Sequence, residues 1–239
     1  MMKSSVDDER PDKVRIGLLL FPDMNALDVT GPAEIFAGST SVDLQLVWKT
    51  TTPVRTSAGW HIVPTLSFRD TPQLDVICVP GGSGQIALMD DDETLGFLTR
   101  QAAGARYVTS VCTGALLLGA AGLLRGYRAT THWMSHDQLA LFDARPTHER
   151  VVVDGNRITG AGVTAGVDFA FVVLAELFGE QEAHAVQLAV EYDPAPPYAV
   201  GRPELAAQEV VSRVKARAAA RQDNRVLASQ SAARRLRIS

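Results

Sequence analysis

Cys112 is the residue in this sequence best placed for nucleophilic chemistry. It follows the apolar run Tyr107–Val111, typical of a buried strand, and precedes Thr113–Ala121, typical of a helix. A sharp strand-to-helix turn of this kind, a nucleophile elbow, presents its side chain at the carboxyl edge of a sheet. The amide groups and dipole at a helix start stabilise a thiolate, so we expect a lowered pKa and a reactive Cys112. Cys78 lies inside an apolar run, where we expect an inert core residue.

Two further segments are expected at the same edge of the sheet. Pro80-Gly81-Gly82-Ser83-Gly84 follows the apolar run Leu74–Val79, and the N–H groups of Gly81 and Gly82 could bind a developing negative charge, as in an oxyanion hole. Asp28 follows the first apolar run, Val14–Phe21. Its carboxylate suits a general acid or base beside the thiol, and it equally suits the cap of a helix that contains Pro32. The residues leave both roles of Asp28 open.

Histidine offers another candidate partner for the cysteine. His132 ends an expected strand, Arg128–His132, where it could pair with Cys112 or simply pack at the strand end; we favour packing. The other four histidines form no His-Glu-x-x-His pattern, and the two cysteines form no Cys-x-x-Cys pattern, so we predict no metal site. They are His61, His136, His148 and His184.

The elements that must position these residues alternate along the chain. Strands are expected at the three apolar runs already named and at Val42–Trp48, which alternates apolar and polar residues. Helices are expected at Ala26–Ala37 and Thr164–Phe178, and a hairpin joins Val151–Val153 to Arg157–Thr159 through Asp154-Gly155. This order predicts an α/β domain with a mostly parallel central sheet and helices on both faces.

Composition sets broad limits on partners and compartment. The chain has 239 residues, a hydrophobic fraction of 46% and a formal net charge of −4, which gives no support to a general nucleic-acid surface. No apolar run approaches the roughly 18 residues of a membrane span. Two cysteines make no disulfide framework. We therefore expect a cytoplasmic protein without nucleic-acid or membrane partners.

Three parts are expected along the chain. Residues 1–12 are charged, lack the apolar core of a signal peptide and are interpreted as a disordered leader. Residues 13–197 form the α/β domain, which closes at the Pro-rich segment Asp193–Pro197. Residues 198–239 are rich in Ala and Arg, and we expect a basic helical extension that packs on the domain or on a dimer partner.

The combination of short motifs resembles the ThiJ/PfpI superfamily of class I glutamine-amidotransferase-like, flavodoxin-like folds. Within it the chain most resembles the isonitrile (isocyanide) hydratases, over about Val14 to Pro197. The motifs are Ser110-Val-Cys-Thr-Gly114, Pro80-Gly-Gly82, Asp28-Val-Thr-Gly-Pro32, Arg128-Ala-Thr-Thr-His-Trp133 and Glu191-Tyr-Asp-Pro-Ala-Pro-Pro197.

The resemblance implies a homodimer with no metal or organic cofactor. It implies a hydro-lyase (carbon–oxygen lyase) reaction that adds water to an isonitrile and gives an N-substituted formamide. Cys112 is then the nucleophile, which forms a thioimidate, and Asp28 is the proton donor, provided that its pKa is raised. Thr113 matches the residue after the nucleophile, where a backbone or hydroxyl donor can steady the substrate. His132 is at most a supporting residue.

Three alternatives remain open. A ThiJ/PfpI-type hydrolase, deglycase or glyoxalase would place a histidine or glutamate near the thiol. AraC-type transcription regulators carry a similar sensor domain, with Leu-Asp-x-Thr-Gly-Pro and Thr-Thr-His-Trp motifs. They append two helix-turn-helix units of about 100 residues, against some 40 residues after Pro197 here. A redox sensor ranks last, because a low-pKa thiol oxidises readily whatever its function.

Overall fold

A seven-stranded sheet forms the centre of the protein. The computed structural model describes residues 13–236, so the predicted leader, residues 1–12, lies outside the described residues. The strand order is β10-β11-β7-β6-β1-β2-β5, and every neighbouring pair is parallel except β10 with β11, the predicted hairpin. The mostly parallel sheet is therefore confirmed. Its strands are β1 (Val14–Leu19), β2 (Val42–Trp48), β5 (Leu66–Ser67), β6 (Val76–Val79), β7 (Tyr107–Val111), β10 (Val151–Asp154) and β11 (Arg157–Gly160).

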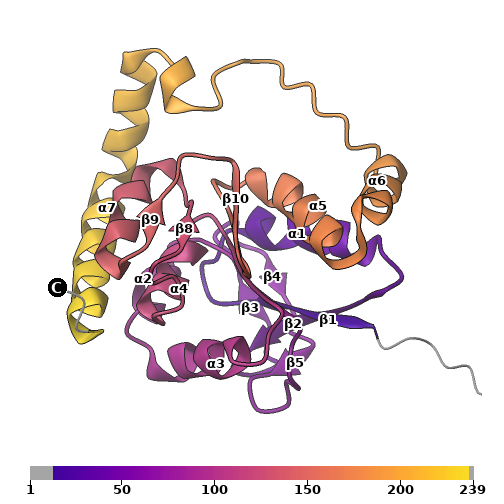
Figure 1. Ribbon diagram of the computed structural model, residues 1–239. Helices are drawn as coiled ribbons and strands as arrows, with labels where there is room; N and C mark the ends of the chain where they lie inside the picture. Colours follow the sequence, from indigo (N-terminus) through magenta and orange to yellow (C-terminus); the bar gives the residue numbers. More distant parts are fainter. Residues whose placement is uncertain (1–12, 237–239) are drawn as a thin grey trace, which may run out of the picture.

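Helices cover both faces of this sheet, as predicted (Figure 1). One face carries α1 (Ala26–Ala37) and α5 (Ala165–Phe178), with α6 (Glu180–Ala189) packed on α5. The other carries α3 (Asp92–Ala102) and α4 (Gly114–Ala120), and two short elements pack on α4, namely α2 (Gln85–Leu88) and the 3₁₀ helix η1 (Trp133–Phe142). Because β1 and β6 lie in the middle of the sheet and are covered on both faces, most of their residues are apolar.

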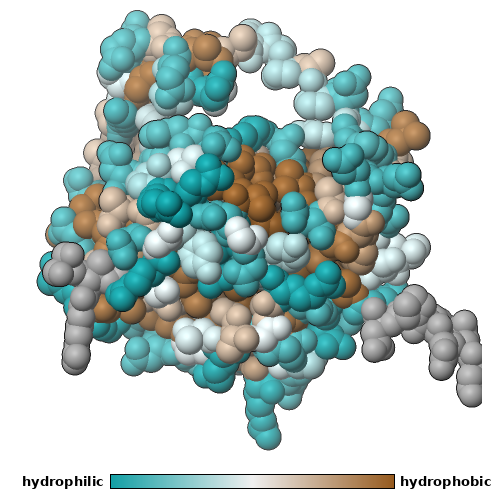
Figure 2. All heavy atoms as spheres, in the orientation of Figure 1, coloured by the Kyte–Doolittle hydropathy of each residue, from teal (hydrophilic) through white to brown (hydrophobic). Residues whose placement is uncertain are grey.

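A long exposed linker follows α6 and leads to the C-terminal helix. The linker contains the 3₁₀ turn η2 (Pro203–Leu205) and arches away from the domain before α7 (Gln208–Arg235) returns along its flank (Figure 1). α7 packs on η1, α2 and α4. Figure 2 shows apolar surface beside α5, at the foot of this arch. Within residues 13–236, no helix is both long and apolar enough to cross a membrane.

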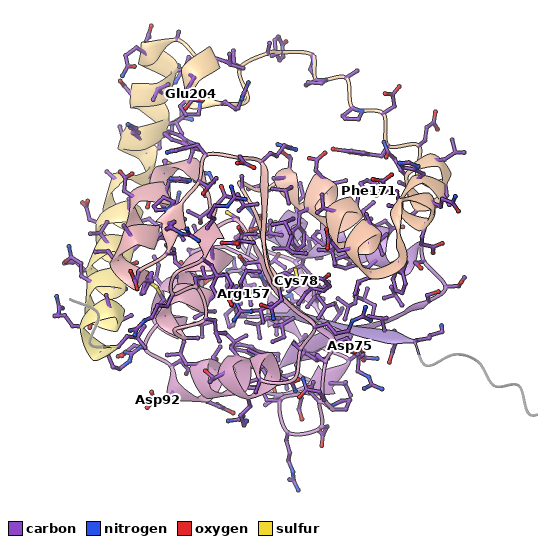
Figure 3. All side chains as sticks on the ribbon, viewed as in Figure 1. Asp75, Cys78, Asp92, Arg157, Phe171 and Glu204 are labelled. Atoms are coloured by element: carbon purple, nitrogen blue, oxygen red, sulfur yellow. The ribbon has the colours of Figure 1, made fainter. Side chains whose placement is uncertain are left out.

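The core lies between the sheet and the two helical layers. Its largest fully buried side chains include Phe21, Phe36, Phe142 and Phe169. Cys78, in the middle of the molecule in Figure 3, is also fully buried, and desolvation raises the pKa of its thiol to about 12. The predicted core position of Cys78 is confirmed.

The predicted strand Arg128–His132 is wrong for most of its length. Only β8 (Arg128–Ala129) is extended, and it pairs with β9 (Arg145–Pro146) in a separate small sheet, as β3 (Val54–Arg55) does with β4 (His61–Ile62). After β8, hydrogen bonds to side chains fix the chain in place of the backbone hydrogen bonds between paired strands. The N–H of Thr130 donates to Thr159 Oγ1 at 2.9 Å, and the hydroxyl of Thr131 donates to the Cys112 carbonyl at 2.7 Å.

Candidate active site

The cysteine turn adopts the elbow geometry that the sequence predicts. Cys112 follows β7 directly and has a φ of +56°, a left-handed conformation that costs a residue with a side chain about 1–3 kcal/mol. Its N–H donates to the carbonyls of Gly160 and Ala161 at 3.0 and 2.8 Å. Gly114 lets α4 begin at once, since a Cβ there would lie 2.0 Å from the Val79 carbonyl oxygen. The surrounding backbone thus forces Cys112 into the turn.

Asp28 lies in the first turn of α1 and is completely buried. It is not the cap of this helix, because Asn25 holds that position and accepts the N–H of Leu27. Asp28 Oδ2 accepts the N–H of Gly81 at 2.9 Å, while Oδ1 has no hydrogen-bond partner among residues 13–236. Desolvation raises the pKa of Asp28 to about 6, against the opposing effects of the Gly81 N–H and the Cys112 thiol.

The Cys112 thiol interacts with this carboxyl group, and its pKa moves in the direction opposite to the prediction. Cys112 is 5% exposed, and burial raises the pKa of its thiol strongly, with a further rise from the nearby Asp28 carboxylate. The backbone N–H groups of Thr113 and Val163 oppose this rise without overcoming it. The expected lowering of the pKa is therefore wrong. The resting site therefore holds a protonated thiol beside a carboxyl group that is ionised above about pH 6.

The glycine loop after β6 lies against the elbow. A Cβ on Gly81 would lie 2.6 Å from the Thr113 backbone nitrogen and 2.9 Å from Asp28 Oδ2, so only glycine fits. Both N–H groups predicted as oxyanion donors are already engaged. That of Gly81 donates to Asp28, and that of Gly82 donates to Thr113 Oγ1 at 3.2 Å. In this structure Gly81 and Gly82 therefore fix the carboxylate and the threonine hydroxyl beside the thiol.

His132 lies near the site but is bonded elsewhere. It caps η1, and its Nδ1 accepts the N–H of Met134 at 3.3 Å. Its ring packs beside Gly162, where a Cβ would lie 3.1 Å from the ring carbon Cδ2. Burial and the positive charges of Arg225 and Arg221 lower the pKa of His132 to about 4. Within residues 13–236 no hydrogen bond joins it to Cys112.

Three contributors to the site were missed by the sequence reasoning. Thr131 secures the Cys112 carbonyl, Val163 supplies a backbone N–H to the sulfur, and Arg225 of α7 reaches the Gly82 carbonyl. The Thr-Thr-His motif carried a signal for Thr131. Residue identities do not indicate which backbone N–H groups reach the sulfur, so Val163 could not be predicted. Arg225 lies in a basic run that looks like a solvated helix face. The described residues hold no group of three or more His, Cys, Asp or Glu side chains suited to a metal.

Known proteins share this sequence and this fold. An isonitrile hydratase from Pseudomonas putida is 51% identical over 225 residues, which cover 94% of this chain and 99% of that protein. A solved ThiJ/PfpI family protein from Pseudomonas syringae matches with a TM-score of 0.88 and 41% identity, covering 96% of this chain and 97% of that one.

A third relative matches only part of its own length. The transcriptional regulator GbdR of Pseudomonas aeruginosa is 31% identical over 148 residues, 61% of this chain but 38% of the regulator. The DJ-1/PfpI family model matches residues 14–176, which contain the elbow, Asp28 and the glycine loop. By this match and by its full-length relatives, the chain belongs to the DJ-1/PfpI family.

Proposed function

We propose that this protein hydrates isonitriles to N-substituted formamides, with Cys112 as nucleophile and Asp28 as the group that moves the proton. The observation that carries the proposal is the buried pair itself: a thiol with a raised pKa beside a carboxylate whose pKa is about 6. The 51% identity to the Pseudomonas putida hydratase supplies the substrate class. An isonitrile carries no net charge and suits an enclosed site.

The first half of the reaction forms a carbon–sulfur bond. The Cys112 sulfur attacks the terminal carbon of the isonitrile while its proton passes to the Asp28 carboxylate. The electron pair left on that carbon then takes the proton back from Asp28, which gives a thioimidate, R–N=CH–S–Cys. A pKa near 6 suits both roles, because the group is ionised at neutral pH yet gives up its proton readily.

The second half returns the enzyme to its starting state. Asp28, ionised again, takes a proton from water as the water oxygen attacks the thioimidate carbon. Asp28 passes that proton to the nitrogen. The carbon–sulfur bond then breaks as the new hydroxyl group becomes the formamide carbonyl, and the hydroxyl proton goes through Asp28 to the sulfur. The sum is one isonitrile and one water consumed and one N-substituted formamide formed. Thr113, whose hydroxyl is held by the Gly82 N–H, lies where it can steady the reacting atoms.

The test is direct hydration of one alkyl and one aromatic isonitrile, with formamide detected by chromatography. Cys112→Ala and Cys112→Ser should reduce formamide to the uncatalysed level, whereas Cys78→Ala, which removes the other buried thiol, should keep the activity. Methylglyoxal assayed beside the isonitriles separates a glyoxalase or deglycase from a hydratase. Undiminished hydration by Cys112→Ala would refute the proposal.

We further propose that the protein is a cytoplasmic homodimer. Exposed apolar side chains around the linker support a second copy of the chain as the partner of this surface. Leu188 of α6 is 82% exposed and Tyr198 of the linker is 78% exposed, and Phe171 of α5 lies half-buried beside the linker. Both cysteines are free, which fits a reducing compartment. Light scattering at micromolar concentration should give twice the chain mass, and Tyr198→Asp should shift it toward the monomer. A monomer at every concentration would refute the homodimer.

A further inference from the structure

α7 carries a buried arginine, Arg225, that pairs with no carboxylate among residues 13–236. Arg225 is 3% exposed, although most of its neighbours on the helix face solvent. Its Nε donates to Gln85 Oε1 at 3.2 Å and its Nη1 to Gln222 Oε1 at 3.0 Å. Within residues 13–236 it makes no salt bridge. Burying an arginine without an anionic partner is costly, so its retention calls for a reason.

The third contact of Arg225 leads into the active site. Its Nη2 donates to the Gly82 carbonyl at 3.4 Å, and Gly82 in turn donates its N–H to Thr113, the residue after the nucleophile. The guanidinium therefore restrains the glycine loop at Gly82, next to the residue that Asp28 holds. Gln85, fully buried itself, extends the same contact to the start of α2.

The charge of Arg225 also acts on the reacting groups. It interacts electrostatically with Cys112, and it contributes to the lowered pKa of His132. Among residues 13–236, the charged groups that interact with Cys112 are Asp28 of α1 and Arg225 of α7, while Arg221 of α7 acts on Arg225 and on His132 at the start of η1. Above about pH 6 His132 is neutral and Asp28 carries one negative charge, so Arg225 is the buried cation that balances the site.

We propose that Arg225 is a positioning residue of the active site: it supplies the positive charge that favours the sulfur anion in the attack step, and it fixes the Gly82 loop against Thr113. The C-terminal helix is then part of the catalytic unit. The inference rests on the proposed function only in taking Cys112 as the nucleophile. Its first test needs no isonitrile.

The test follows the alkylation rate of Cys112 by iodoacetamide against pH, read by intact-protein mass spectrometry. This reagent is neutral, so surface charge does not concentrate it, and Cys78 is fully buried. Arg225→Met should lower the rate at about pH 9 at least about tenfold and move the pH profile upward. Arg225→Lys should retain most of the rate. Arg217→Met, an exposed arginine on the same helix, should behave as wild type.

A second variant separates charge from packing. Arg235 anchors the end of α7 to Asp90 and to the Met89 carbonyl, away from the cysteine. Arg235→Met loosens the helix and keeps the charge of Arg225, so it should leave the pH profile in place. The proposal is overturned if Arg225→Met leaves the profile unchanged or if Arg235→Met reproduces its shift. Circular dichroism checks folding, and if Arg225→Met does not fold, loss of the rate in a folded Arg225→Lys overturns the proposal.

Activity measurements distinguish the two proposals from each other. Arg225→Met should lower kcat for isonitrile hydration and leave KM nearly unchanged, because the charge acts on the attack step. An Arg225-dependent alkylation profile in a protein that hydrates no isonitrile would refute the hydratase and leave the role of Arg225 standing. Isonitrile hydration together with an alkylation profile that does not depend on Arg225 would refute only the proposed role of Arg225.

Discussion

Asp28→Asn should make the protein inactive and more stable at the same time. The substitution keeps the shape of the carboxyl group and removes its charge. Asp28 is fully buried, and desolvation raises its pKa from the usual 3.8 to about 6. The folded protein therefore binds this proton more tightly than the unfolded chain does. As pH rises from about 4 to about 6 the wild type loses stability, and the loss persists at higher pH.

The size of this loss follows from the two pKa values. Each pH unit of difference corresponds to about 1.4 kcal/mol, so the rise from 3.8 to about 6 amounts to about 3 kcal/mol. Asparagine has no charge to desolvate, and its Oδ1 can still accept the Gly81 N–H, as a weaker acceptor. Asp28→Asn should thus gain up to about 3 kcal/mol at about pH 7.5, and about 1 kcal/mol at about pH 4.5.

Urea unfolding at these two pH values measures the difference. Asp223→Asn is the matched control, because Asp223 is exposed on α7 and should show little change at either pH. Formamide production from an isonitrile is followed on the same samples and should fall to background in Asp28→Asn. An Asp28→Asn protein that is no more stable than wild type at about pH 7.5 would refute the view that charge burial dominates at this position.

Three further predictions follow from the same contacts. Hydration should fall about tenfold per pH unit below about pH 6, as Asp28 takes up the proton that it must accept from the thiol; a level rate down to about pH 5 would contradict that role. Thr131→Val leaves the buried Cys112 carbonyl without its 2.7 Å hydrogen bond and should cost about 1–3 kcal/mol in urea unfolding. Thr99→Val, on an exposed helix position, is its control, and equal small costs for both would count against the bond. His132→Gln should keep most of the hydration rate, because Nδ1 of the ring already accepts the Met134 N–H and no hydrogen bond among residues 13–236 joins it to Cys112; a loss of about a hundredfold would make it a partner of the cysteine.

The elements with a strong local pattern could be predicted from the sequence. The apolar runs at β1, β6 and β7 leave few alternatives to buried parallel strands, and Asp154-Gly155 selects the hairpin between β10 and β11. The position of Cys112 between such a run and a small-residue helix was enough to predict the elbow. By contrast, the strand predicted at Arg128–His132 ends early, because threonine hydroxyls replace the ladder there with bonds to distant segments.

The electrostatics of the site could not be predicted in the same way. The helix start beside Cys112 suggested a lowered pKa, but the thiol is enclosed by several elements, and its burial outweighs two backbone N–H groups. Arg225 was hidden for a related reason. An arginine in a basic run looks solvated until the fold shows which side of α7 meets the domain. Burial is a property of the assembled fold, and local residue patterns report it poorly.

The attachment of α7 sets how often its contacts with the glycine loop are broken. The linker before it is exposed for nearly its whole length, and only a few side chains of α7 are buried, among them Arg225, Ser229 and Ala232. A helix held in this way can undock while the sheet stays intact, so its opening free energy lies below that of global unfolding. Amide hydrogens of α7 should therefore exchange with deuterium earlier than those of β6 and β7. During each such opening Arg225 leaves Gln85 and the Gly82 carbonyl, so the glycine loop beside Cys112 loses this restraint whenever the helix unfolds locally.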